Sequence, residues 1–124
     1  MNVVDSSAWL EYFAGGKNAD FFASAIEDAH NLLVPTVCLL EVFKVQLRQR
    51  GESAAQVSVA GMQLGRVIGL DEEIAERAAR LGVAHKLPLA DSIVYATALA
   101  HGADVWTQDT DFDGLPSVHF RAKP

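Results

Sequence analysis

Four carboxylates occupy positions where an acidic side chain is unusual. Asp5 and Asp109 each come at or just after the end of a short apolar run, while Glu41 and Asp91 lie inside nearly uncharged stretches. A carboxylate is costly to bury unless it is paired with a cation. Neither Glu41 nor Asp91 has a basic residue three or four positions before it, and only Glu41 has one three positions after it, Lys44. These acids therefore indicate a site that binds a positively charged group.

A divalent cation would relieve both the burial of these carboxylates and their mutual repulsion. The four histidines show no metal-ligand spacing, and the single cysteine, Cys38, excludes a cysteine-rich zinc site. A site made only of carboxylate oxygens favours Mg²⁺ or Mn²⁺. Such an ion activates water and neutralises charge on a phosphate, so the predicted chemistry is hydrolysis of a phosphodiester. One of the carboxylates could also accept a proton from the attacking water.

Each acid also has an ordinary structural explanation. Asp5 could cap a helix, and Asp91 could complement a helix dipole from the first turn. Asp109 and Asp111 could form a turn, and Glu41 could belong to a structural ion pair. The site would be absent only if all of these structural explanations were true at once, so a shared cation site is the leading interpretation.

The elements that would position these acids alternate between short apolar runs and longer helical segments. The expected strands are Asn2–Val4, Asn31–Val34 closed by Pro35, Val67–Leu70, Ala103–Thr107 and Val118–Phe120. Six helices are expected. The first three are Ser6–Ala14, with Ser6 and Ser7 as N-caps, Ala19–Ala29, and a helix that is capped by Thr36 and runs to about Arg50. The last three are Ser53–Leu64, a helix that is capped by Asp71 and runs to about His85, and a helix that has Pro88 in its first turn and ends at His101–Gly102.

Strands separated by helices predict βαβ units and a mostly parallel sheet covered on both faces. Ligands of such sheets bind beyond the carboxyl ends of the strands, at the point where the strand order reverses. If the strands before Asp5 and Asp109 are both central and parallel, the two acids emerge on the same edge of the sheet.

Length and composition set the class of protein. A chain of 124 residues, half of them hydrophobic, predicts one domain spanning residues 1–124. The net charge of −6 argues against a basic nucleic-acid-binding module, but not against nucleic acid as the substrate of a metal site. We expect a cytoplasmic protein, because the chain has one cysteine, no signal-peptide pattern and no apolar stretch long enough to cross a membrane.

Four motifs resemble those of the PIN-domain nucleases, most closely the VapC-type toxins of toxin–antitoxin pairs. The matching segments are Val4–Leu10, the early-helix residue Glu41, Leu87–Ser92 and Val105–Phe112, with Trp106 a mild departure where aliphatic residues are usual. Their order and spacing extend over essentially the whole chain. The resemblance implies an α/β fold of three layers, α/β/α, with a central, mostly parallel sheet of four or five strands.

The resemblance also implies roles for individual side chains. The family's four acidic catalytic and metal-binding positions fall on Asp5, Glu41, Asp91 and Asp109. Asp111 would assist through the water shell of the metal ion. Polar positions that orient the acids or the metal-bound water fall on Ser7 and Thr107.

The function implied is that of a Mg²⁺- or Mn²⁺-dependent endoribonuclease, held inactive by a cognate antitoxin and forming a homodimer. One alternative is a non-catalytic protein-binding module with an acidic pocket. A second is a phosphatase or DNA nuclease that uses the same carboxylates. Cleavage of RNA that requires metal separates the first reading from the others.

Two further sets of side chains have both an ordinary and a functional explanation. Apolar residues at helical spacing could be core or an antitoxin groove; they are Trp9, Tyr12 and Phe13 on one helix and Leu40, Phe43 and Leu47 on another. Basic residues could be a solvated face or could guide RNA phosphates; they are Lys44, Arg48, Arg50, Arg66, Lys86 and Arg121.

Overall fold

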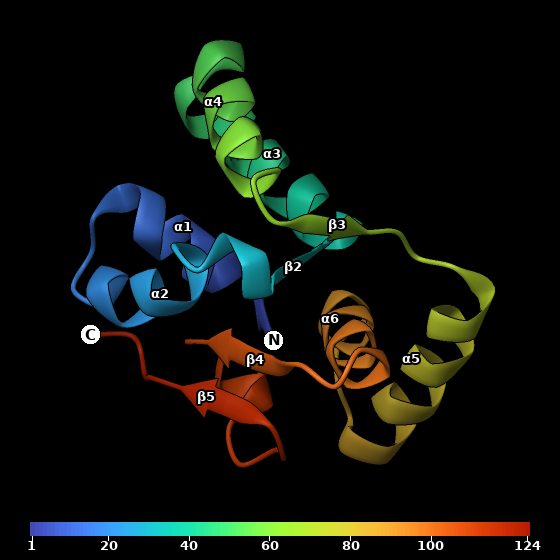
Figure 1. Ribbon diagram of the computed structural model, residues 1–124. Coiled ribbons are helices and arrows are strands. Elements are labelled where there is room, and N and C mark those ends of the chain that lie inside the picture. The colour runs from blue at the N-terminus through green and yellow to red at the C-terminus, as the bar shows by residue number, and fades with distance from the viewer.

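A computed structural model describes all residues, 1–124, and contains a central sheet of five parallel strands in the order β3-β2-β1-β4-β5 (Figure 1). The strands are β1 Asn2–Val4, β2 Leu32–Pro35, β3 Arg66–Ile68, β4 Asp104–Thr107 and β5 Val118–Phe120. The helices are α1 Ser6–Ala14, α2 Ala19–Ile26, α3 Thr36–Arg50, α4 Glu52–Met62, α5 Glu72–His85 and α6 Leu89–Ala100, with short 3₁₀ turns η1 Ala29–Asn31 and η2 Thr110–Phe112.

The helices form two layers around the sheet. Helices α1 and α2 lie on one side and α5 and α6 on the other, while α3 and α4 pack together and project as an arm (Figure 1). The predicted three-layer α/β/α architecture with a parallel sheet is therefore confirmed, with five strands. No helix is both long and apolar enough to cross a lipid bilayer.

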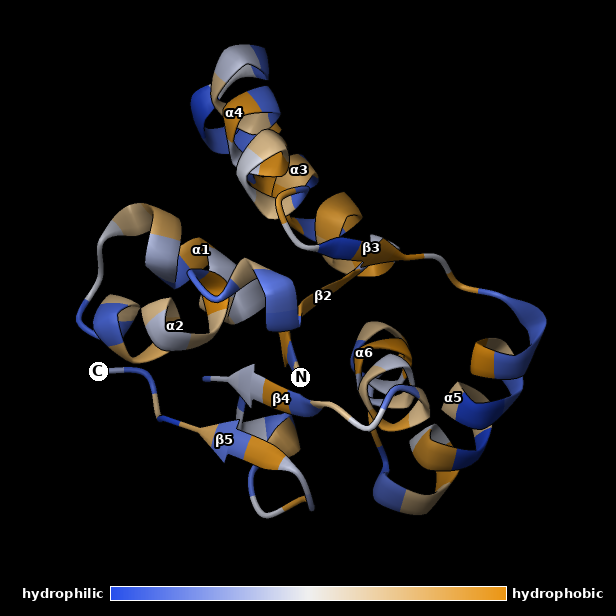
Figure 2. Ribbon diagram, in the orientation of Figure 1, coloured by the Kyte–Doolittle hydropathy of each residue, from blue (hydrophilic) through white to orange (hydrophobic).

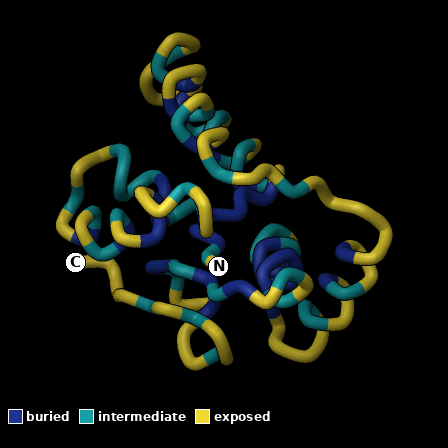
Figure 3. The backbone as a smooth tube through the Cα atoms, in the orientation of Figure 1, coloured by how far each residue is buried: buried dark blue, intermediate teal, exposed yellow.

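The core lies along the sheet and under α6, where burial is continuous (Figure 3). All four residues of β2 are buried, and most of the strand has the orange colour of hydrophobic residues (Figure 2). Unbroken apolar strands are typical of parallel sheets with helices on both faces, because neither face meets water. Trp9 lies in this core, only 1% exposed, so its explanation as a packing residue is correct.

The strand order reverses at β1. The chain runs from β1 to β2 and β3 in one direction, then returns through α5 and α6 to place β4 and β5 on the other side of β1. Strands β1 and β4 are parallel neighbours, with Val4 opposite Trp106, and the backbone N–H of Asp5 donates to the carbonyl of Trp106 over 3.0 Å. Asp5 and Asp109 therefore follow two adjacent strands at the same edge, as predicted.

Helix α1 spans Ser6–Ala14 as predicted, but the N-cap positions of α1, α3 and α6 differ from the prediction by one residue. Helix α1 begins at Ser6 with Asp5 in the N-cap position, so the two serines are helical residues and not caps. Thr36 is likewise the first residue of α3, and Pro88 precedes α6. In all three cases an extended residue directly precedes the helix, which fits the fixed φ of proline at two of them. Asp71 does cap α5, accepting the backbone N–H of Ile74 over 2.9 Å.

The predicted boundaries of four further elements, α2, β2, α4 and β3, are wrong by one to three residues. Helix α2 ends at Ile26, because the segment to Asn31 forms a 3₁₀ turn in which Asn31 donates to the Asp28 carboxylate over 3.0 Å. Such local side-chain bonds compete with continued α-helix. Pro35 is the last residue of β2 and does not merely follow it. Helix α4 and strand β3 each begin one residue earlier than predicted and end two residues earlier.

Candidate metal centre

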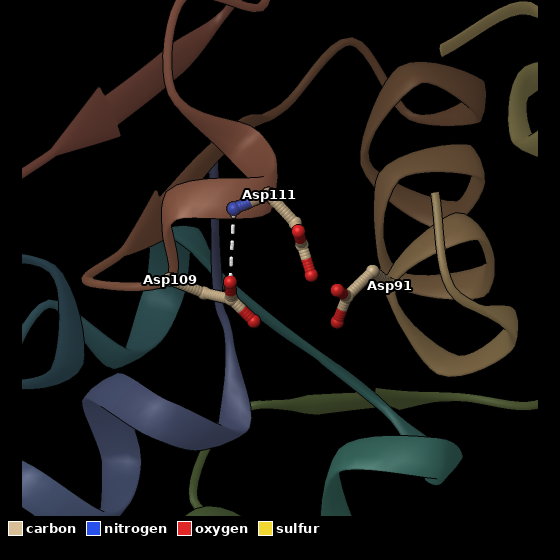
Figure 4. A group of neighbouring side chains, drawn as sticks. All are labelled: Asp91, Asp109 and Asp111. Atoms are coloured by element: carbon tan, nitrogen blue, oxygen red, sulfur yellow. Dashed lines mark hydrogen bonds between the residues drawn. The ribbon is translucent and has the colours of Figure 1, made fainter. Parts of the chain in front are cut away.

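Three aspartates converge at the carboxyl edge of the sheet. One carboxylate oxygen from each of Asp91, Asp109 and Asp111 lies within 4.8 Å of the other two, and the side chains point toward one another (Figure 4). Asp91 comes from the first turn of α6, whereas the other two belong to the segment after β4. Oxygens bound to one Mg²⁺ at ~2.1 Å are at most ~4.2 Å apart, so a small inward movement would allow all three to bind one ion.

Asp109 has a structural role as well as a place in this cluster. Its Oδ1 accepts the backbone N–H of Asp111 over 2.9 Å and so caps η2 (Figure 4). Its own backbone N–H donates to Thr107 Oγ1, also over 2.9 Å. The turn explanation for this residue is therefore correct, yet the cap occupies one carboxylate oxygen and leaves the other directed toward Asp91 (Figure 4).

Asp5 is the most deeply buried acid of the site, with 2% of its surface exposed. It occupies the N-cap position of α1, as its structural explanation predicted, but its side chain makes no capping hydrogen bond. Instead Oδ2 accepts two hydroxyl hydrogen bonds, from Ser7 over 2.7 Å and from Thr107 over 2.9 Å. Thr107 thus links Asp5 to the backbone of Asp109. Ser7 and Thr107 are therefore placed to hold the Asp5 carboxylate in one orientation.

Glu41 approaches the same pocket from α3. It is half-buried, and its Oε1 accepts the hydroxyl of Ser6 over 3.0 Å. Burial, and then the negative charges of Asp5 and Asp109, raise its pKa. The proposed structural ion pair is absent, since the salt bridges of the chain are Glu73–Arg77, Glu76–Arg80 and Asp104–His119.

The electrostatics of the pocket are those of acids that lack a positive partner. Burial raises the pKa of Asp5, with the charge of Asp109 adding to the effect. Burial and then the charges of the neighbouring aspartates raise the pKa of Asp91 to about 8. Carboxylates that face each other disfavour their own ionisation, and a divalent cation reverses this effect. The donor set, made of oxygens alone, fits a hard cation such as Mg²⁺ or Mn²⁺.

All five acids predicted for the site therefore lie at one edge of the sheet, but at two distances from its centre. Asp91, Asp109 and Asp111 form the tight cluster, while Asp5 and Glu41 face it closely enough for their charges to be felt. The structure places each residue, and the catalytic role of each stays a prediction.

Two supporting groups were not predicted. The sequence predicts Ser6 to be a helix cap, but its hydroxyl donates to Glu41 Oε1. Gln108 is buried and joins the site segment to α1: it accepts from Asn18 Nδ2 over 3.0 Å and donates to the carbonyl of Ser7 over 3.4 Å. The only signal in the sequence was its place between Thr107 and Asp109. The six basic residues named above are all exposed and none forms an ion pair.

Comparison with known proteins places this arrangement in a family. A model of the PIN domain matches residues 3–117. Ribonuclease VapC4 of Mycobacterium tuberculosis is 34% identical over 128 aligned positions, covering 94% of this chain and 92% of that protein. A toxin–antitoxin complex from Klebsiella pneumoniae has a TM-score of 0.83 at 24% identity, covering 96% of both chains. The sarcin–ricin-loop-cleaving toxin VapC20 of M. tuberculosis has a TM-score of 0.78 at 20% identity, covering 95% of this chain and 97% of that chain.

Proposed function

Because the chain belongs to the PIN-domain family and is similar to its VapC-type ribonucleases, we propose that its acidic pocket cleaves RNA with a bound divalent cation. The observation that carries this proposal is the convergence of Asp91, Asp109 and Asp111 beside Asp5, with no cationic side chain to neutralise them. The pocket lies at the reversal of strand order, where substrates of such sheets bind.

We assign the metal-binding role to Asp5, Glu41, Asp91, Asp109 and Asp111; Asp111 lies close enough to Asp91 and Asp109 to bind the ion directly or through its water shell. When bound, Mg²⁺ or Mn²⁺ supplies the positive charge that activates water and stabilises the developing negative charge on the phosphate. Ser7 and Thr107 hold the Asp5 carboxylate in one orientation, and Ser6 does the same for Glu41. Fixed ligand orientation keeps the pocket organised before substrate arrives.

The proposed partner is an antitoxin, as in the toxin–antitoxin complexes that share this fold. An apolar hollow of about 450 Å³ on the projecting arm is lined by Leu40, Phe43, Leu47 and Val59. Leu40 is 63% exposed and Leu47 is 42% exposed, so these two leucines are not buried in the core of the chain and leave an apolar surface open to a partner. We assign this hollow to an apolar segment of the antitoxin.

A homodimer is also part of the proposal, and sedimentation velocity of the purified chain tests it.

Cleavage of RNA by the purified chain tests the function. We expect RNA to be cut with Mg²⁺ or Mn²⁺ and the reaction to stop with EDTA. Asp5→Asn should abolish cutting while circular dichroism shows an unchanged fold. Cleavage of DNA or of a small phosphate ester in preference to RNA would support a different hydrolase. An absence of any hydrolysis, with antitoxin binding indifferent to EDTA, would support the non-catalytic binding module.

A further inference from the structure

A second hollow adjoins the acidic pocket, between α1 and α3. Its volume is about 470 Å³, within the range of about 300–1,000 Å³ that holds small organic molecules. Its lining is mostly polar and includes three amides and two basic side chains; they are Gln46, Gln49, Gln108, Arg50 and Lys123. We call this hollow the amide pocket.

The amide pocket shares a wall with the acidic site, although none of the five acids lines it. Ser6 and Ser7 line it, and the same two hydroxyls hold Glu41 and Asp5. Gln108 also lines it and directly precedes Asp109 in the chain. A group bound in the amide pocket would therefore lie next to whatever the carboxylates bind.

Gln46 is the unusual side chain of this pocket. The residue is only 5% exposed and its amide makes no hydrogen bond within the protein, but the amide atoms reach the surface of the pocket, since the buried polar side-chain atom without a partner is Trp9 Nε1. It shares the buried face of α3 with Cys38 and Val42, at the helical spacing of an apolar row. The other buried amide on this wall, Gln108, bonds to Asn18 and Ser7.

Because the Gln46 amide makes no hydrogen bond to the protein and still meets the water of the pocket, its donor and its acceptor are both free to bind a molecule that enters. An amide offers a donor and an acceptor side by side, which matches the paired donor and acceptor on the edge of a nucleobase. Sequence-specific readers of RNA bind unstacked bases through such edges.

We propose that the amide pocket binds one nucleobase of the RNA next to the scissile phosphate and that Gln46 reads its edge. The proposal rests on the proposed function, since it places the base beside the cleavage site. Arg50 and Lys123 give the pocket two positive charges against the one negative charge of Glu11, whose carboxylate already accepts the backbone N–H of Asn18, so a flanking phosphate would lie on the side of the two basic residues. A peptide partner fits the apolar hollow on the arm better than this polar one.

The first test compares Gln46→Met with Gln63→Met. Methionine keeps the volume of the side chain and removes the amide, and Gln63 is an exposed glutamine at the end of α4 that makes no side-chain hydrogen bond. With a randomised RNA and Mg²⁺ or Mn²⁺, we expect wild type and Gln63→Met to share a base preference beside the cut. Gln46→Met should lose about 10-fold of that preference, the scale of one good base contact.

Three results would overturn the proposal. The first is an unchanged base preference in Gln46→Met, and the second is an equal loss of cleavage for all sequences, which indicates a structural role. The third is an unchanged preference accompanied by weaker antitoxin binding, which would assign the pocket to the protein partner.

A second measurement does not depend on cleavage. The four ribonucleosides are titrated in EDTA into protein labelled with ¹⁵N, and the side-chain amide resonances of Gln46 are followed, with those of Gln63 as the control. We expect one nucleoside to shift the Gln46 resonances most strongly and the Gln63 resonances not at all. Nucleoside binding without RNA cleavage would refute the proposed function alone. A Gln46 resonance that no nucleoside moves would refute the base-binding pocket, even if RNA is cut.

Discussion

The starts of α5 and α6 carry acids at similar positions and use them in opposite ways. At α5, Asp71 caps the helix and the next two residues, Glu72 and Glu73, are exposed to water. At α6, Asp91 also stands in the first turn, but it is half-buried and faces Asp109 and Asp111. A helix dipole on its own would stabilise the ionised carboxylate and lower its pKa. The pKa of Asp91 is instead raised to about 8.

The difference shows that the surroundings of an acid outweigh its position on a helix. The first turn of α5 faces solvent, where water stabilises three neighbouring charges. The first turn of α6 faces the end of β4, where burial and other carboxylates dominate. The two helix starts therefore make a matched pair for separating a structural acid from one that holds a cation.

The largest expected effect is on RNA cleavage by Asp91→Asn. Loss of a group that merely orients a metal ligand typically costs about 10- to 100-fold in activity, so loss of a ligand should cost more than about 100-fold. The matched change at α5, Asp71→Asn, keeps the cap and should leave the rate unchanged. Single-turnover cleavage of a defined RNA measures both. Equal rates for the two variants would show that Asp91 is only a helix-start residue.

The next largest effect concerns the hydroxyls that hold Asp5. Ser7→Ala and Thr107→Val each remove one hydrogen bond to Oδ2, and each should reduce cleavage by about 10- to 100-fold. Ser24→Ala is the control, because that hydroxyl bonds only the carbonyl of Phe21 on an exposed face. Both reductions should shrink when the metal concentration is raised, if the hydroxyls act by organising a ligand. A reduction in Ser24→Ala of similar size would point to a general loss of stability.

A smaller effect is expected on the stability of the metal-free protein. The pKa of Asp91 is about 8 in the folded chain against 3.8 for an ordinary aspartate, so the folded state holds more protons between these values. The free energy of unfolding should therefore fall as the pH rises from about 4 to about 8. Asp91→Asn removes this contribution and should be more stable than wild type near pH 8 in EDTA.

Urea unfolding at pH 4 and pH 8 measures that stability difference. Added Mg²⁺ should stabilise wild type at pH 8 and have less effect on the variant, because only the native carboxylates bind the ion. Burial raises the pKa of Asp5 and Glu41 in the same direction, so the variant should keep part of the pH dependence. A wild type whose stability rises from pH 4 to pH 8 in EDTA would contradict the electrostatic description of the pocket.

The fold and the acidic site were largely predictable because their signals are local. Apolar runs bounded by turns located all five strands, and an uncharged neighbourhood distinguished Asp91 from Asp71. What the local pattern missed depends on tertiary contacts. The hydroxyl of Ser6 could bond its own helix or reach across to Glu41, and only the packing of α1 against α3 decides between them. Element ends shifted for a similar reason, since side-chain bonds such as Asn31 to Asp28 end a helix where propensity would continue it.

Gln46 is a second residue whose position, but not whose contacts, could be predicted from the sequence. Its spacing from Cys38 and Val42 puts it on the buried face of α3, which the sequence alone could have revealed. Whether a glutamine on that face bonds a neighbour or lines a hollow depends on the residues of α1 and of the segment after β4. Gln46 lies 39 positions from Ser7 and 62 positions from Gln108 in the chain, and no local pattern specifies contacts over such separations.

The smallest expected effect completes the comparison at α5. Asp71→Ala removes the carboxylate that accepts the backbone N–H of Ile74. The change should cost about 1 kcal/mol of stability, because this N–H in the first turn of α5 has no other acceptor within the helix. Thermal unfolding should show a fall in Tm of about 4 °C for a domain of this size. Asp71→Asn should keep most of the stability, since asparagine caps nearly as well as aspartate. RNA cleavage per folded molecule should stay the same in both variants. If Asp71→Ala instead lost activity while remaining folded, then acids at both helix starts would serve the pocket, and the contrast between α5 and α6 would not separate structure from chemistry.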